Sequence, residues 1–230
     1  MTTQEVHQLE QSKMAINKNL EYALAYARLG LAVLILHTIK DGKCTCGNDH
    51  CVSPAKHPYG ALMPHGVKDA TTDSRTITAW WSSFPVGNIG IATGTKHGIW
   101  VIDVDIKPKE GKNGGFSLDA YEAKYGDLPD TVMAETGGGG KHYFFKYPVG
   151  KVIQNSTSKI GLCLDVRGEN GYVAVEPSLH ISGKCYEWIS EQSPSEIEFA
   201  EYCLPDEFLA VESKKTTMSS TQSLGGTEWD

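Results

Sequence analysis

Apolar residues along this chain recur at two spacings, one typical of helices and one of strands. Early in the chain they recur at helical spacing up to Gly30, a residue suited to the end of a helix. The apolar run 31–36 then predicts a buried strand. Asp73 is placed to cap a helix over residues 74–83, whose two adjacent tryptophans are expected to pack in the core and which Pro85 ends.

Strand patterns dominate the rest of the chain. Residues 162–167 and 172–175 flank a turn rich in glycine and asparagine, so they are expected to pair as a hairpin. The other predicted elements are strands at 88–93, 99–106, 131–136, 141–145 and 185–189, and helices at 116–125 and 206–211.

The two ends of the chain lack this patterning. Residues 1–18 are polar and are expected to form a flexible leader, and residues 212–230, rich in Ser, Thr, Gly and Lys, are expected to be a disordered tail or linker. Residues 19–211 then form one folded domain. Neither a secretory signal nor a run of ~18–20 apolar residues is present, so we expect a cytoplasmic protein that does not bind membranes.

The 230 residues carry a net charge of −7, and 40% of them are hydrophobic. This length and composition suit a globular protein with a substantial core. Proteins that clamp duplex nucleic acid non-specifically are basic overall, so the charge argues against that role. It does not exclude a local basic groove, and a carboxylate-rich metal site would add negative charge.

Three of the six cysteines, Cys44, Cys46 and Cys51, lie close together in the sequence, and His57 follows shortly after. In a chain without a secretory signal such a cluster is more typical of a metal site than of disulfides. These four residues are a candidate Cys3His zinc site. His50 is a rival fourth ligand, and reduced thiols in a surface loop are the alternative.

The segment around this cluster, residues 43–58, has little apolar content of its own, so zinc would serve to fold the loop. The folded loop could present Lys56 to a nucleic-acid strand. Other lysines that could contact a template backbone, or be ordinary surface residues, are Lys68, Lys107, Lys109 and Lys112.

Two carboxylates, Asp103 and Asp105, interrupt the apolar strand over 99–106. Residues two apart in a strand point to the same face, about 6.5–7 Å from each other. Two like charges on a half-buried face repel each other unless a cation lies between them. The pair therefore suggests a divalent-metal site, the alternative being a solvated strand end.

A second candidate site is the run of four glycines, residues 137–140, followed by Lys141 and His142. Glycines allow backbone N–H groups to approach an anion, and the two side chains add charge and donors. This favours an anion site over a simple flexible turn. It is not a P-loop, because no helix follows and the Lys-Ser/Thr pair is absent.

A third candidate is Asp165, which interrupts another apolar strand, with Arg167 two residues later on the same face. Asp165 could complete a carboxylate triad with Asp103 and Asp105, while Arg167 could hold a phosphate through two hydrogen bonds. The alternative is a plain ion pair between Asp165 and Arg167.

Taken in order, these segments resemble the N-terminal domain of bifunctional DNA primase/polymerases, the prim-pol branch of the archaeo-eukaryotic primase superfamily. That family is common in phages, plasmids and mobile elements. The resemblance runs from Ala23 to Ile189 and rests on the cysteine segment ending in Lys56-His57-Pro58, the strand and turn 89–94, Asp103-Val-Asp105, Gly139-Gly-Lys-His142, and Asp165-Val-Arg167 leading to Pro177-Ser178.

The resemblance implies an α+β fold: an RRM-like palm of the archaeo-eukaryotic primase type with a mixed sheet, an N-terminal α/β unit and a zinc-binding loop. Asp103, Asp105 and Asp165 match the family's metal-binding acids, which would hold two Mg²⁺ or Mn²⁺ ions. His142 matches the histidine that contacts the phosphates of the incoming nucleotide, and Arg167 falls where a triphosphate-binding residue is expected. The other expected substrate-binding residues are Thr136, Gly139, Gly140, Lys141 and Ser178.

The implied function is metal-dependent transfer of nucleotides from NTPs or dNTPs to a 3′-hydroxyl on a single-stranded DNA template, in the replication of a mobile element, phage or plasmid. Nucleoside triphosphates, template and primer would be its partners, with a helicase or helical primase extension in cis or in trans. Two alternatives are a metal-dependent nuclease or phosphodiesterase, which would not need a triphosphate-binding hairpin, and a non-catalytic nucleotide- or single-strand-binding module, which would not need three acids.

Overall fold

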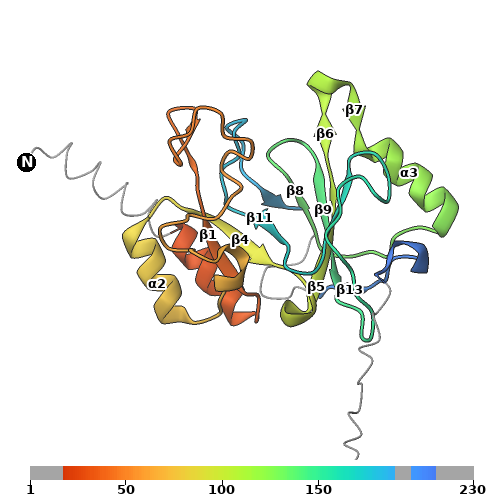
Figure 1. Cartoon of the computed structure of the whole chain (residues 1–230), viewed down its shortest axis with the longest axis horizontal. Coiled ribbons are helices and arrows are strands. Elements are labelled where there is room, and N and C mark those ends of the chain that lie inside the picture. The colour runs from red at the N-terminus through yellow and green to blue at the C-terminus, as the bar shows by residue number, and fades with distance from the viewer. Residues whose placement is uncertain (1–17, 190–197, 211–230) are drawn as a thin grey trace, which may run out of the picture.

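The computed structural model describes residues 18–189 and 198–210, which form a mixed α+β fold built around two main sheets (Figure 1). Apart from residue 18, the expected leader lies outside the described residues, and so does the expected tail at 212–230. In the described part of the chain no helix is long and apolar enough to cross a membrane.

The first sheet is antiparallel, with the strand order β1–β4–β11. Its strands are β1 (Val33–Leu36), β4 (Asn88–Ala92) and β11 (Tyr172–Val175). Two helices pack against it and share its core: α2 (Ser74–Ser83) and a helix whose described part covers residues 18–28 (Figure 1). This unit is the N-terminal half of the fold, completed by β11 from much later in the chain.

The helix α2 confirms the sequence prediction at both ends. The Asp73 carboxylate accepts a hydrogen bond from the Thr76 backbone N–H at 2.8 Å, which satisfies one of the free donors of the first turn. Trp80 and Trp81 are both buried, and the Trp81 indole donates to the Gly87 carbonyl at 3.0 Å. The tryptophan pair is therefore core, as expected.

The second sheet has the order β10–β5–β9–β8–β12, and β13 lies parallel to β9, which makes the sheet mixed. The helix α3 (Gly114–Tyr125) packs on one of its faces through Leu118 and Tyr121. The strands of this sheet are β5 (Ile99–Val104), β8 (Met133–Glu135), β9 (Lys141–Lys146), β10 (Leu164–Arg167), β12 (Glu187–Trp188) and β13 (Ala200–Glu201).

Alternation along β5 decides which way the acidic residues face. Trp100 and Ile102 pack in the cluster that contains α3, whereas Ile99 and Val101 pack in the cluster that contains the first sheet. Because side chains alternate between the faces of a strand, Asp103 continues the row of Ile99 and Val101. Its carboxylate therefore lies on the side of the second sheet that faces the first sheet.

The expected hairpin at 162–175 is wrong. β10 pairs with β5 in the second sheet, and β11 pairs with β4 in the first. The connecting turn is held by distant residues: the Thr93 hydroxyl donates to the Gly168 carbonyl at 2.7 Å, and the Asn155 side chain accepts from the Gly168 N–H at 2.8 Å. The turn thus carries the chain from one sheet to the other.

The remaining predicted elements are present with altered bounds: α3 and β9 are slightly longer than expected, and the others are shorter. The strand expected at 185–189 reduces to β12, and the helix expected at 206–211 reduces to a single 3-10 turn, η5 (Asp206–Phe208), with residue 211 outside the described part. Short pieces complete the fold: β2 (Ile39–Lys40), β3 (Lys43–Cys44), η1 (Gly66–Asp69), η2 (Thr95–His97), β6 (Ile106–Lys107), η3 (Pro108–Glu110) and β7 (Lys112–Asn113).

Candidate active site

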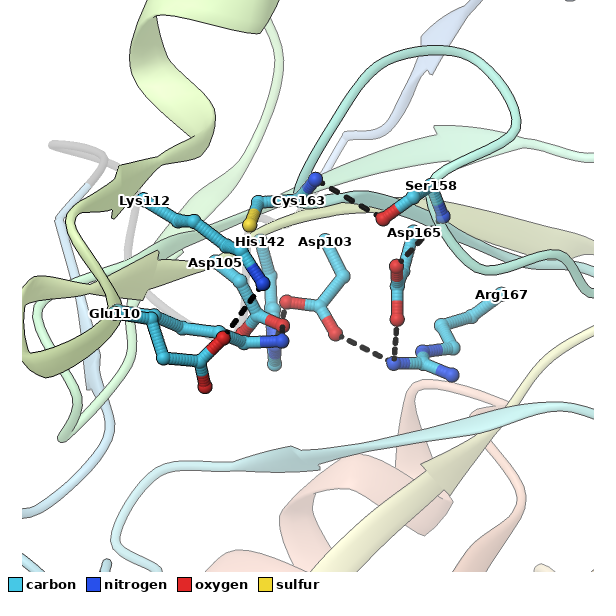
Figure 2. A network of polar contacts seen from close by, with 10 residues as sticks. Asp103, Asp105, Glu110, Lys112, His142, Ser158, Cys163, Asp165 and Arg167 are labelled. Carbon is cyan, nitrogen blue, oxygen red and sulfur yellow. Dashed lines mark hydrogen bonds and ion pairs between the residues drawn. The ribbon is translucent and has the colours of Figure 1, made fainter.

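Three polar side chains lie side by side across the second sheet. In the strand register Asp103 of β5 is opposite Asp165 of β10 on one side and His142 of β9 on the other. Arg167 reaches back from the end of β10, so that its Nη2 lies 3.0 Å from Asp103 Oδ2 and 2.9 Å from Asp165 Oδ2 (Figure 2). On the other side His142 Nε2 lies 3.3 Å from Asp103 Oδ1.

The side chains of Asp165, Asp103 and His142 are buried, and the charges around them compensate one another. Burial alone would raise the pKa of Asp103, but His142 and Arg167 outweigh it and hold that pKa well below its usual range. Burial raises the pKa of Asp165, against the opposing effect of Arg167. Burial would lower the pKa of Arg167, yet Asp103 and Asp165 together raise it. The guanidinium is therefore the cation that allows two facing carboxylates to be buried.

Asp105 follows the last residue of β5 and is anchored by its backbone. Its N–H donates to the Cys163 carbonyl and its carbonyl accepts from the Gly114 N–H, both at 2.9 Å. Its carboxylate lies 3.3 Å from Lys107 Nζ, and this contact raises the pKa of Lys107. Asp105 is only half-buried, so its carboxylate is accessible beside the buried row.

A cleft of about 560 Å³ opens in front of Asp103 and Asp105, whereas the buried Asp165 is not among its lining residues. Its walls come from both sheets and from residues 43–58, the cysteine loop, so it lies between the two halves of the fold. The residues that line it include Asp103, Asp105, Lys107, His142, Arg167 and Tyr186 of the second sheet and its connections, Tyr172, Val173 and Ala174 of β11, Ser53, Lys56 and His57 of the cysteine loop, and His180.

The cysteine loop brings together the four predicted zinc ligands. One ligand atom each from Cys44, Cys46, Cys51 and His57 lies within 4.8 Å of the others. His57 Nε2 is 3.5 Å from the sulfurs of both Cys44 and Cys51. Zn–S and Zn–N bonds of ~2.3 and ~2.0 Å at a tetrahedral angle separate sulfur from nitrogen by about 3.5 Å, so the donor set fits zinc. His50 is exposed and does not belong to this group.

The carboxylate oxygens of Asp103, Asp105 and Asp165 are not gathered as closely as the zinc ligands. Among the residues that the structure describes, the Cys3His group is the one set of three or more potential ligand atoms so closely gathered. Arg167 lies between Asp103 and Asp165, and Lys107 contacts Asp105. The oxygen donors nevertheless suit hard divalent cations, for which carboxylates are the usual protein ligands.

The glycine run forms a tight turn that closes on itself. The Gly140 N–H donates to Thr136 Oγ1 at 3.0 Å, and the Gly139 N–H donates to the Thr136 carbonyl at 2.8 Å. A Cβ at Gly140 would lie 2.2 Å from the Val104 carbonyl oxygen, so glycine is required for close packing against β5. The N–H groups of Gly139 and Gly140 are therefore bonded within the turn, so in the structure they do not point to a ligand.

Two further residues expected to bind substrate lie away from the cleft lining. Lys141 is exposed and precedes His142 in β9, so the two side chains point to opposite faces of the sheet. Ser178 is completely buried, and its hydroxyl bonds both the N–H and the carbonyl of Ile89. The structure gives Ser178 a structural contact with β4.

The lysines considered for template contact are dispersed. Lys56 and Lys107 line the cleft. Lys68 lines a separate hollow of about 190 Å³ together with Lys96 and His97. Lys112 forms an exposed ion pair with Glu110, and the Lys109 side chain lies outside the described part of the structure. Of the five lysines, Lys56 and Lys107 therefore line the same cleft as Asp103 and Asp105.

The sequence did not single out His180 or Tyr172, both of which line the cleft. His180 stands in a short polar turn just after Pro177-Ser178, and that placement is the local signal that could have found it. His142 also carries a feature that only the structure shows. Its Nδ1 is buried and has no hydrogen-bond partner among the described residues.

A model of the family "bifunctional DNA primase/polymerase, N-terminal" matches residues 23–202, a span that contains the cysteine loop, the three aspartates, His142 and Arg167. A search of curated proteins finds no match. The family match covers most of the chain, and the chain therefore belongs to the bifunctional DNA primase/polymerase N-terminal family.

Proposed function

We propose that this chain catalyses nucleotidyl transfer from NTPs or dNTPs to the 3′-hydroxyl of a primer on single-stranded DNA. The observation that carries the proposal is the row Asp165–Asp103–His142 across three adjacent strands, bridged by Arg167 at the base of the cleft. Family membership supports the reaction class. Replication of a mobile element, phage or plasmid, with a helicase or helical extension as partner, is the context we propose.

Asp103, Asp105 and Asp165 would hold the divalent ions, Mg²⁺ or Mn²⁺. Such ions, when bound, lower the pKa of the attacking hydroxyl and neutralise charge on the leaving oxygen. The fit rests on the donor chemistry: each residue offers carboxylate oxygens, and two of the three are directly opposite in the strand register.

His142 orients Asp103 through its Nε2 and lines the cleft. With Nε2–H directed at Asp103, its buried Nδ1 is left without a partner in the described protein. A polar group of the bound nucleotide would satisfy that nitrogen.

Arg167 provides a second positive group at the same place. It is tied to both buried aspartates in the structure, and its side chain remains 30% exposed. A guanidinium so placed can exchange a carboxylate partner for a phosphate oxygen without leaving the cleft. We propose that it contacts the triphosphate.

The six-stranded sheet with α3 would serve as an RRM-like palm, beside the α/β unit formed by the first sheet and its helices. Zn²⁺ at Cys44, Cys46, Cys51 and His57 would fold the loop that forms another wall of the cleft. No covalent protein intermediate is needed, because positioning and charge neutralisation suffice for this transfer.

The test is extension of a labelled primer on a single-stranded template with dNTPs and either Mg²⁺ or Mn²⁺. Asp103→Asn and Asp165→Asn should lower the rate by about 10³-fold or more, as expected for loss of a group that acts on the transition state. Asp130→Asn changes an exposed aspartate outside the cleft and is the control. Extension at the wild-type rate by Asp103→Asn would contradict the proposal.

The same assay separates the two alternative functions. A nuclease would shorten the labelled primer in the presence of metal. A non-catalytic binding module would retain the strand or nucleotide without turnover. An unprimed template with labelled NTPs and dNTPs then shows whether the chain starts strands and which sugar it prefers.

A further inference from the structure

His180 is held in a fixed orientation by the turn that follows it. The Ser182 N–H donates to His180 Nδ1 at 3.2 Å, and the Ser182 hydroxyl donates to the Gly137 carbonyl at 2.6 Å. His180 Nδ1 also lies 3.0 Å from the Ser182 hydroxyl oxygen, so these contacts fix the ring in both neutral tautomers. In the tautomer in which Nδ1 accepts from the Ser182 N–H, the proton is on Nε2. Nε2 forms no hydrogen bond within the described protein, so in that tautomer His180 presents a free N–H donor.

The glycine run makes room for this ring. A Cβ at Gly137 would lie 2.3 Å from His180 Cβ, so any side chain there would displace the histidine. A Cβ at Gly138 would lie 3.5 Å from His180 Cε1 and 3.7 Å from Nε2. The distances at Gly138 are ordinary van der Waals contacts, so the position of His180 explains Gly137 and does not require glycine at 138.

His180 and Lys56 line the same cleft as Asp103 and Asp105. Burial, together with the charge of Lys56, lowers the pKa of His180, against the opposing effect of Asp105. Burial and the charge of Lys56 both favour the neutral imidazole. Lys56 forms no ion pair with the described residues, and it lies between Cys51 and His57 of the cysteine loop, whose fold places it at the cleft.

The other cations of the cleft are already engaged. Arg167 contacts Asp103 and Asp165 at 3.0 and 2.9 Å, and Lys107 lies 3.3 Å from Asp105. A bound nucleoside triphosphate brings several negative charges, and its outer phosphates need donors that are not neutralised by carboxylates. Lys56 and His180 line the cleft and meet this condition without giving up a carboxylate partner, as Arg167 would have to do.

We propose that His180 Nε2 and Lys56 Nζ form a phosphate subsite that holds the outer phosphates of the incoming nucleotide. The subsite rests on the proposed function for the identity of its ligand, since a nucleoside triphosphate is the anion that reaches this cleft in nucleotidyl transfer. It assigns the phosphate contacts to the cysteine loop and the 180–184 turn, in place of the glycine run.

The test compares equilibrium binding of a dNTP and the corresponding dNMP to the zinc-loaded chain, with His180→Ala, Lys56→Ala and Lys56→Arg as variants. The two alanine variants should weaken dNTP binding about tenfold or more and leave dNMP binding close to wild type, since only the outer phosphates lose a donor. Lys56→Arg keeps the charge and should keep most of the discrimination. Lys184→Ala removes an exposed lysine from the same turn that does not line the cleft, and serves as the control.

Zinc content and melting temperature show whether each variant is folded, and Lys56 keeps the proposal open to refutation if His180→Ala fails to fold. In primer extension the alanine variants should raise the KM for dNTP more than they lower kcat. Wild-type discrimination of dNTP from dNMP by both alanine variants overturns the subsite, as does a wild-type chain that binds the two equally. A wild-type chain that discriminates through His180 and Lys56 but does not extend primers keeps the subsite and refutes the polymerase function.

Discussion

Replacing Arg167 with glutamine removes the cation that bridges two buried carboxylates. The side chains of Asp103 and Asp165 are only 12% and 8% exposed, and Arg167 Nη2 lies at 3.0 and 2.9 Å from them. Removing one partner of a buried ion pair costs about 3–5 kcal/mol, because the remaining charge is left uncompensated. Arg167 is itself 30% exposed, so water screens part of the repulsion and we expect a loss of about 2–4 kcal/mol.

For a chain of this size the loss corresponds to a fall in melting temperature of about 5–15 °C. The assay is thermal unfolding followed by circular dichroism in metal-free buffer with the zinc retained. Asp165→Asn in the same chain removes one of the two facing carboxylates and should restore much of the stability, so the double-mutant cycle should give a coupling of about 1–3 kcal/mol. Arg75→Gln, exposed on α2, should change stability by no more than about 0.5 kcal/mol.

Added Mn²⁺ extends the test to the proposed metal site. A cation held by Asp103, Asp105 and Asp165 takes over the neutralising role of Arg167, so Mn²⁺ should raise the melting temperature of Arg167→Gln more than that of the wild type. If Arg167→Gln is as stable as Arg75→Gln, the reasoning about buried repulsion is refuted. If it is destabilised but Mn²⁺ does not restore it, these aspartates are not the cation site.

Three further predictions concern zinc, the glycine run and Ser178. Purified protein should contain about one equivalent of zinc, which His57→Ala should lose and His50→Ala should keep, as measured by atomic absorption; the reverse result would contradict the ligand set seen here. Gly140→Ala should cost about 2–3 kcal/mol in chemical denaturation because its Cβ would lie 2.2 Å from a carbonyl oxygen, whereas Gly60→Ala, with nothing within 4 Å, should be nearly neutral, and equal stability of the two variants would refute the packing role. Ser178→Ala should cost about 1–3 kcal/mol by leaving two backbone groups of β4 without partners, while the KM for nucleotide stays unchanged. A raised KM at wild-type stability would instead return Ser178 to the substrate site.

Local sequence pattern predicted most elements, because the signals for them lie within a few residues of one another. The Asp73 cap and the helix over 74–83 are set by neighbours along the chain, and the structure has them as expected. The crowding of Cys44, Cys46 and Cys51 likewise indicated a metal group from spacing alone. The sequence could not decide whether His50 or His57 is the fourth ligand, because that depends on how the loop folds.

The glycine run shows the limit of an interpretation from neighbours in the sequence. Four consecutive glycines suggest an anion nest when only the chain itself is considered. The structure assigns Gly137 to close contact with His180 and Gly140 to close contact with Val104, and neither neighbour is near in sequence. A missing Cβ can serve a ligand or a packed neighbour, and only the tertiary structure distinguishes the two.

What the sequence by itself determined is the inventory of chemistry: two aspartates on one strand, a third with an arginine on another, a histidine after the glycines, and a Cys3His set. Tertiary structure alone decided that Asp165 and His142 flank Asp103, that Arg167 bridges the two buried acids, and that β10 and β11 belong to different sheets. The physical reason is that strand partners and register are fixed by contacts between segments far apart in the chain, which no local period encodes.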